Sequence, residues 1–323
     1  MGGSPTRLRP GAARPQVFLP IWECPPWCVS CAMLIAHRTA PFVVCLAALL
    51  ACKGAGKSES TEQQGGGLPT VAPVAPTSSD VTFRKLVPKV GAKMKYTRRS
   101  SAKFTLSGKV HRSEAAATAS VAVQGSDQFR IWKAEVDVTE LYATEQEGTA
   151  AEKKTVSPLA GSKYVVTRAD DGSLSALDSN GSKVASSQMK LLKEEFGQVF
   201  EKNADSEFLP DRPIKLGEKL VPASDSVIKM LGVKDDGNIT IDGVEFILKS
   251  ATGERASFDS SLTFTQKLGS IRLRAKLKGN IDLTPEGAWI VALDLKGPIT
   301  ILDSGGNEKG SGDLSISGSQ TVN

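Results

Sequence analysis

The thiol of Cys52 is the reactive group whose position in the sequence is most informative. It directly follows Phe42–Ala51, an apolar run that carries no charge. This run is too short to cross a bilayer as a helix, which needs about 20 residues, but it has the length of the hydrophobic region of a secretory signal peptide. The small residue Ala51 stands where a signal peptidase would cut. The sequence therefore predicts cleavage before Cys52.

The residues Leu49-Leu50-Ala51-Cys52 resemble the lipobox of bacterial lipoproteins. The resemblance implies that the signal peptidase recognises Leu49, Leu50 and Ala51, and that a diacylglycerol is attached to the sulfur of Cys52. It implies a membrane partner, reached through this covalent lipid, and a location in the bacterial cell envelope. Lys53 takes the position where aspartate favours retention in the inner membrane. The resemblance therefore favours the outer membrane, facing the periplasm.

Composition divides the chain into three parts. Residues 1–51 are the leader and signal peptide, and translation starts at Met1 or at Met33, which is followed closely by a basic pair and the apolar run. Residues 52–80 are rich in Gly, Ser, Pro, Thr, Gln and Ala, and they are predicted to be a disordered tether because they have little apolar surface to offset chain entropy. Residues 81–323 are predicted to form one β-rich globular domain.

Charge and side-chain chemistry exclude several classes of function. Without residues 1–51 the chain keeps 36 basic and 34 acidic residues, so no nucleic-acid partner is expected. No cysteine follows Cys52, which leaves no disulfide framework and no cysteine nucleophile. His111 is the only histidine after that point, and its place beside Arg112 is typical of a solvated side chain. No metal site and no cofactor are predicted.

From about Val81 onward, apolar residues recur with a period of two, which is typical of strands buried on one face. The clearest series are Trp132, Ala134, Val136 and Val138; Ala256, Phe258, Ser260, Leu262 and Phe264; Ile271, Leu273, Ala275, Leu277, Gly279, Ile281 and Leu283; and Trp289, Val291, Leu293 and Leu295. A turn at Thr284–Gly287 and a final strand at Leu314–Thr321 are predicted. Strands of this length must twist. We therefore expect a mainly β (α+β) fold, a curved antiparallel sheet or half-barrel covered by one or two amphipathic helices.

Two segments have helical periodicity instead. Ser187–Lys202 places apolar residues on one face, and Ser224–Leu231 is a shorter helix that should end at Gly232. The longer helix is expected to cover the concave face of the sheet, with Ser186 or Ser187 as its N-cap. If the trough beneath it holds an acyl chain, its candidate lining residues are Met189, Leu192, Phe196 and Phe200.

Other motifs give little support for catalysis. The sequence has no Gly-x-Ser-x-Gly elbow and no His-Glu-x-x-His. A carboxylate pair like that of a glycosidase stays open on composition alone. The basic residues Arg272, Arg274, Lys276 and Lys278 share one strand face. They are interpreted as the solvated face of a one-sided sheet, with contact to an anionic surface or an envelope polymer as the alternative.

Beyond the lipobox, the domain resembles small bacterial envelope lipoproteins of unassigned function. At the level of the fold it also resembles the half-barrel of lipoprotein-localisation carriers, in which a curved sheet wraps helices around an apolar cavity. The resemblance implies a non-catalytic, lipid-anchored envelope protein with a binding or scaffolding role and an apolar ligand between sheet and helix. The alternative function is a cell-wall or glycan hydrolase that uses acidic residues.

Overall fold

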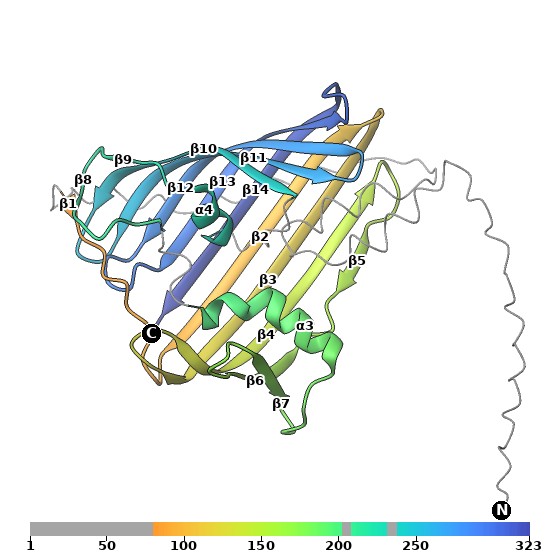
Figure 1. Cartoon of the computed structure of the whole chain (residues 1–323). Helices are drawn as coiled ribbons and strands as arrows, with labels where there is room; N and C mark the ends of the chain where they lie inside the picture. Colours follow the sequence, from red (N-terminus) through yellow and green to blue (C-terminus); the bar gives the residue numbers. More distant parts are fainter. Residues whose placement is uncertain (1–79, 202–207, 231–237) are drawn as a thin grey trace, which may run out of the picture.

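The computed structural model describes residues 80–201, 208–230 and 238–323. Most strands belong to one antiparallel twelve-stranded sheet with the order β7-β6-β4-β3-β2-β14-β13-β12-β11-β10-β9, and β5 pairs with β4 outside this path. Figure 1 shows that the sheet is strongly curved and that two short helices lie over it. The predicted fold class, mainly β with a curved antiparallel sheet and one or two covering helices, is confirmed.

The bounds of the elements are as follows. The strands are β1 (Asp80–Val81), β2 (Lys93–Leu106), β3 (Lys109–Ser126), β4 (Ile131–Glu147), β5 (Lys153–Val156), β6 (Ser162–Arg168), β7 (Leu174–Asp178), β8 (Ile214–Lys215), β9 (Lys219–Leu220), β10 (Ile239–Ala251), β11 (Ala256–Leu268), β12 (Ile271–Leu283), β13 (Ile290–Asp303) and β14 (Glu308–Val322). The helices are α3 (Ser186–Phe196), the 3₁₀-helix η2 (Gly197–Phe200) and α4 (Ser224–Met230).

The alternation of apolar and polar residues defines an inner, apolar face and an outer, polar face. Every second residue of β12, from Leu273 to Leu283 with a break at Gly279, is buried, and the cross-strand register aligns these residues with the buried residues of β11. The β12–β13 turn forms at the predicted place, with Gly287 in the left-handed region at φ 91°. The period of two thus correctly predicted which side of these strands faces the core.

The last strand, β14, pairs with β2 on one side and with β13 on the other. This pairing joins the hairpins from the two halves of the domain into one continuous sheet, and Figure 1 shows β14 beside β2 in the middle of it. The described part of β14 is longer than predicted and begins at Glu308. Its register with β2 is unbroken from Gly310 to Val322.

Both helices pack on the inner face. Buried residues of α3 and η2 join those of β3, β4, β6 and β7 in one hydrophobic cluster, whereas α4 packs against β10 to β14 in a second cluster. The predicted longer helix is therefore present, but it is α3 followed by a 3₁₀ turn. Its N-cap is Ala185, without a capping side chain, and not the predicted Ser186 or Ser187, since the helix already includes both serines. Leu231 and Gly232 lie outside the described residues.

Two further expectations were wrong. Trp132 was predicted to share the buried face of Ala134, but it is 41% exposed and Ile131 is buried instead. Register shifts between β3 and β4 near Gly125 change the alternation there, and the Trp132 ring packs where a side chain of Gly125 would stand. His111 is not solvated: it is buried on the inner face and stacked on Phe104 with ring centroids 5.1 Å apart.

Gly279 and Gly297 lie on the adjacent strands β12 and β13. A Cβ at Gly279 would collide with the carbonyl oxygen of Asp294, and one at Gly297 would collide with the carbonyl oxygen of Lys276. The register is the same before and after this point, so the glycines mark a close approach of two backbones and not a bulge.

We predict that Gly297→Ala destabilises the protein by about 1–3 kcal/mol, because the added methyl group forces two paired backbones apart. Urea denaturation would measure the change. Gly253→Ala is the matched control, since a Cβ there meets nothing within 4 Å, and its effect should stay within about 0.5 kcal/mol. Equal stabilities of the two variants would contradict the close approach.

Candidate ligand cavity

A cavity of about 240 Å³ lies on the inner face of the sheet, between α3, η2 and the strands at the middle of the sheet. Its walls come from β2, β3, β13 and β14, from the α3–η2 segment, from the end of α4 and from the β12–β13 turn. Residues of both hydrophobic clusters line it, such as Phe196 of one and Met230 of the other. The cavity therefore lies at the seam between the two parts of the core.

Most of the lining is apolar. Phe196 and Val199 contribute from the helical side, and Leu293 and Ile290 contribute from β13. Trp289 reaches the cavity because the preceding turn is tight: its ring packs where a side chain of Gly287 would stand, and only glycine fits there at φ 91°. An apolar wall of this kind favours an apolar ligand over a sugar.

The charged groups that line the cavity, within the described residues, are Arg98, Glu195 and Glu201. Arg98 projects from the inner face of β2, and its Nη2 lies 3.4 Å from Oε2 of Glu195 on α3. The side chain of Glu195 is 11% exposed and that of Arg98 is 31% exposed. The cavity thus combines an apolar wall with one largely buried ion pair.

Burial changes the acidity of this pair. Desolvation raises the pKa of Glu195 to about 7, Arg98 opposes the rise, and the neighbouring Glu194 adds to it. Desolvation also lowers the pKa of Arg98, while Glu195 raises it. Desolvation is the larger cause for both groups, so attraction within the pair does not fully offset the cost of taking both charges out of water.

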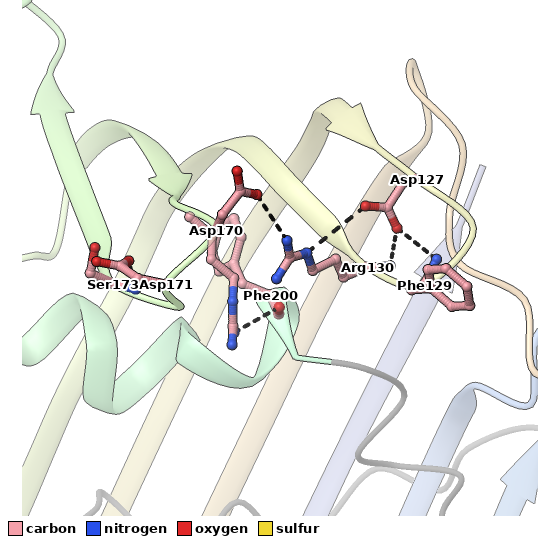
Figure 2. A network of polar contacts seen from close by, with 8 residues as sticks. Asp127, Phe129, Arg130, Asp170, Asp171, Ser173 and Phe200 are labelled. Carbon is pink, nitrogen blue, oxygen red and sulfur yellow. Dashed lines mark hydrogen bonds and ion pairs between the residues drawn. The ribbon is translucent and has the colours of Figure 1, made fainter.

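A polar network at the edge of the sheet fixes η2 against the strands (Figure 2). Nη1 of Arg168, at the end of β6, donates to the carbonyl oxygen of Phe200 at 2.9 Å and lies 3.5 Å from Glu201. Nearby, Arg130 lies 3.2 Å from Asp170, and Asp127 accepts hydrogen bonds from the backbone amides of Phe129 and Arg130. These contacts hold the β3–β4 and β6–β7 turns together beside the end of the helical segment.

The four residues predicted from the helix periodicity occupy different places. Phe196 lines the cavity. Leu192 and Phe200 are buried in the core against β3, β4 and β6, and Met189 packs at the edge of the same cluster. Leu49, Leu50, Ala51 and Cys52 lie outside the described residues.

The basic residues Arg272, Arg274, Lys276 and Lys278 lie on the outer face of β12, away from the cavity. Their neighbours across β11 are Lys267, Thr265, Thr263 and Ser261. Arg272 donates to the carbonyl oxygen of Ser304, and none of the four forms an ion pair with a described carboxylate. Contact of these residues with an anionic surface or an envelope polymer stays a prediction.

Sequence reasoning missed Arg98, Glu195 and Trp289. Signals for the first two were present: Arg98 has the same parity as the buried Met94 and Ala102 of β2, and Glu195 lies three residues after the buried Leu192. A charged residue on an apolar face usually has a partner. The pairing itself depends on how α3 crosses the sheet, and the periodicity of neither element contains that information.

Comparison with known proteins assigns no family. No protein-family model matches the chain, and no curated protein matches it significantly. A structure on lipid–protein interactions in lipovitellin matches with a TM-score of 0.35 and 7% identity over 73% of this chain, which spans about a quarter (26%) of that chain. DynF from the dynemicin biosynthesis pathway of Micromonospora chersina matches with a TM-score of 0.21 and 11% identity over 80% of this chain and 92% of its own. At these TM-scores neither likeness bears on function.

In residues 80–201, 208–230 and 238–323, no helix has the length and apolar character needed to span a membrane. In the same residues, no group of three or more His, Cys, Asp or Glu side chains is placed to hold a metal ion.

We predict that Glu195→Gln removes a pH-dependent loss of stability. The raised pKa means that the folded chain binds this proton more tightly than the unfolded chain, whose glutamate titrates near 4.3. The contribution of Glu195 to stability is therefore greatest below about pH 4.5 and is lost as the pH rises through about 7. The wild type should lose stability as the pH rises from 5 to 8, and the variant should not show this loss. The difference in unfolding free energy, variant minus wild type, should therefore increase by up to about 3 kcal/mol over this range.

Chemical denaturation at several pH values would measure this difference. Glu194→Gln is the matched control, because Glu194 is next in sequence on α3 and its ion pair with Lys190 is long at 3.9 Å. Parallel stability profiles for the wild type and Glu195→Gln would contradict a buried, proton-binding Glu195.

Proposed function

We propose that this protein is a non-catalytic, lipid-anchored protein of the bacterial cell envelope, and that the cavity beneath α3 and η2 holds one apolar chain. The observation that carries the proposal is the combination of an apolar cavity at the seam of the core with the lipobox at Leu49–Cys52. The lipobox supports anchoring of the chain through Cys52. The cavity supports a binding role for the domain that the tether holds near the membrane.

The size of the cavity supports a single chain as the ligand. Its volume of about 240 Å³ lies just below the range of roughly 300–1,000 Å³ that is usual for small-molecule sites. A lipid with two or three acyl chains would need more space. Ala117 and Gly318, on the strands that flank Arg98, leave room for a ligand because they carry little or no side chain.

The alternative, a hydrolase that uses acidic residues, has one observation in its favour. Glu195 and Glu201 both line the cavity, and a pKa near 7 would suit Glu195 as a general acid. However, Arg98 and Arg168 lie within ion-pair distance of these two carboxylates. A largely apolar wall also offers a sugar few hydrogen-bonding partners. Binding is therefore the function that we propose.

We predict that the full chain, purified gently from membranes, carries one non-covalent single-chain lipid. Native mass spectrometry would show the added mass. Ala117→Leu, which fills the cavity from β3, should reduce the occupied fraction several-fold. Ala122→Leu is the matched control, because Ala122 lies on the outer face of the same strand and should leave the bound mass unchanged.

A clean ligand-free mass for the wild type would overturn the binding role. Clearing of peptidoglycan in a zymogram, lost on Glu195→Gln, would instead establish the hydrolase.

We also predict that Cys52→Ser abolishes lipidation. A palmitate analogue supplied in growth medium should label the wild type, and detergent phase partition should place it in the detergent-rich phase. Cys45→Ser is the matched control, because this cysteine lies within the apolar run and should leave labelling intact. If Cys52→Ser still incorporates the palmitate analogue, the prediction of a lipobox at Leu49–Cys52 is wrong.

A further inference from the structure

We infer that the cavity selects a single-chain amphiphile with a carboxylate head, and that Arg98 binds this head in place of Glu195 while the chain lies along the apolar wall. The inference rests on the proposed binding function and specifies the chemical class of the ligand. It follows from the presence of one guanidinium in the wall of a cavity that is otherwise mostly apolar.

Arg98 lines the cavity between two small residues. Its partners across the strands are Ala117 on β3 and Gly318 on β14, and all three residues line the cavity. Larger side chains at these two positions would cover the guanidinium. Small ones leave space beside it, and a planar guanidinium can receive a carboxylate through two parallel hydrogen bonds.

The contact between Arg98 and Glu195 is loose enough to be replaced. Its N–O distance is 3.4 Å, whereas a strong charge-assisted hydrogen bond of this type measures about 2.7–2.9 Å. A carboxylate that is free to orient in the cavity can approach more closely than one held by the backbone of α3. A ligand carboxylate therefore gains a better bond than the one that it displaces.

The exchange also keeps the charge of the cavity balanced. When a ligand carboxylate pairs with Arg98, Glu195 takes up one proton from solvent and becomes neutral. Burial already favours the protonated form, since it raises the pKa of Glu195 to about 7. Glu194, which adds to this rise, lies 3.9 Å from Lys190, and Glu201, another carboxylate of the cavity lining, lies 3.5 Å from Arg168.

The apolar wall provides the site for the chain. Phe196, Val199, Trp289 and Leu293 line the cavity from the helical segment and from the β13 side. An amphiphile with its head at Arg98 therefore places its methylene groups against these residues. Trp289 becomes a reporter of the bound chain because it is in the wall.

The test uses the full chain in phosphatidylcholine nanodiscs and two probes, 11-bromoundecanoate and 11-bromoundecanol, whose bromine quenches tryptophan fluorescence. The signal of Trp289 is isolated by subtracting the quenching of Trp289→Phe. We expect saturable quenching by both probes, with the carboxylate at least tenfold tighter at pH 6. We expect Arg98→Gln to remove this preference.

The pH dependence gives a second measurement that does not depend on the folding of Arg98→Gln. With a pKa near 7 for Glu195, its protonated fraction falls about tenfold between pH 6 and pH 8, so carboxylate affinity should fall by about the same factor. Glu195→Gln should remove this dependence and keep the higher affinity at pH 8. The affinity for the alcohol should not change with pH.

Two outcomes separate the failure of this inference from the failure of the proposed function. If the quenching of Trp289 gives the same affinity for the acid and the alcohol, selection by Arg98 is overturned, and the cavity remains an apolar binding site. No saturable, Trp289-dependent quenching by either probe would overturn the proposed binding function itself.

Discussion

The structure depends on covering one apolar sheet face with helices that are too short for it. β3 has 18 residues and is roughly 60 Å long, whereas α3 has 11 residues and is roughly 16 Å long. The helix therefore covers only part of the inner face, and α4 covers another part against different strands. The cavity lies where these two covered regions meet.

Burying the ion pair at this seam costs desolvation free energy. A buried charge pair is often no more stable than apolar residues of the same size, because desolvation offsets the attraction. Several neighbouring residues of the inner face near the seam, such as Ala117, Ala119 and Leu293, are apolar. A purely structural seam would be expected to continue in that way. The cost of burying Arg98 and Glu195 therefore supports the proposed role of this pair in recognition.

Local sequence patterns predicted much of the fold. Alternation with a period of two identified the buried face of β11 and β12. The turn residues before Trp289 correctly predicted the turn that joins β12 to β13. The prediction for Trp132 was wrong because a register shift between β3 and β4 cannot be seen in the apolar–polar alternation of β4 alone. His111 was misplaced because the sequence did not show that Phe104 faces it across the hairpin.

The candidate site could not be predicted because its parts are distant in sequence. Arg98 and Glu195 meet only because α3 crosses over β2, and Gly318 stands beside Arg98 only because β14 pairs with β2. These pairings result from the packing of the whole sheet, while periodicity reports the environment of one element at a time. The helix periodicity predicted one lining residue of the cavity, Phe196, but the charged lining residues could be identified only from the folded structure.

The two faces of the sheet differ in what they can recognise. The outer face presents rows of Ser, Thr, Lys and Arg, and its basic residues on β12 are solvated charges that attract anions without fixed geometry. In the cavity, by contrast, one partly buried guanidinium projects from β2 beside an apolar wall and lies 3.4 Å from Glu195. A charge in such surroundings interacts more strongly and discriminates between head groups, because an unpaired partner is costly to bury. The proposed selectivity therefore belongs to the seam and not to the basic residues of the outer face.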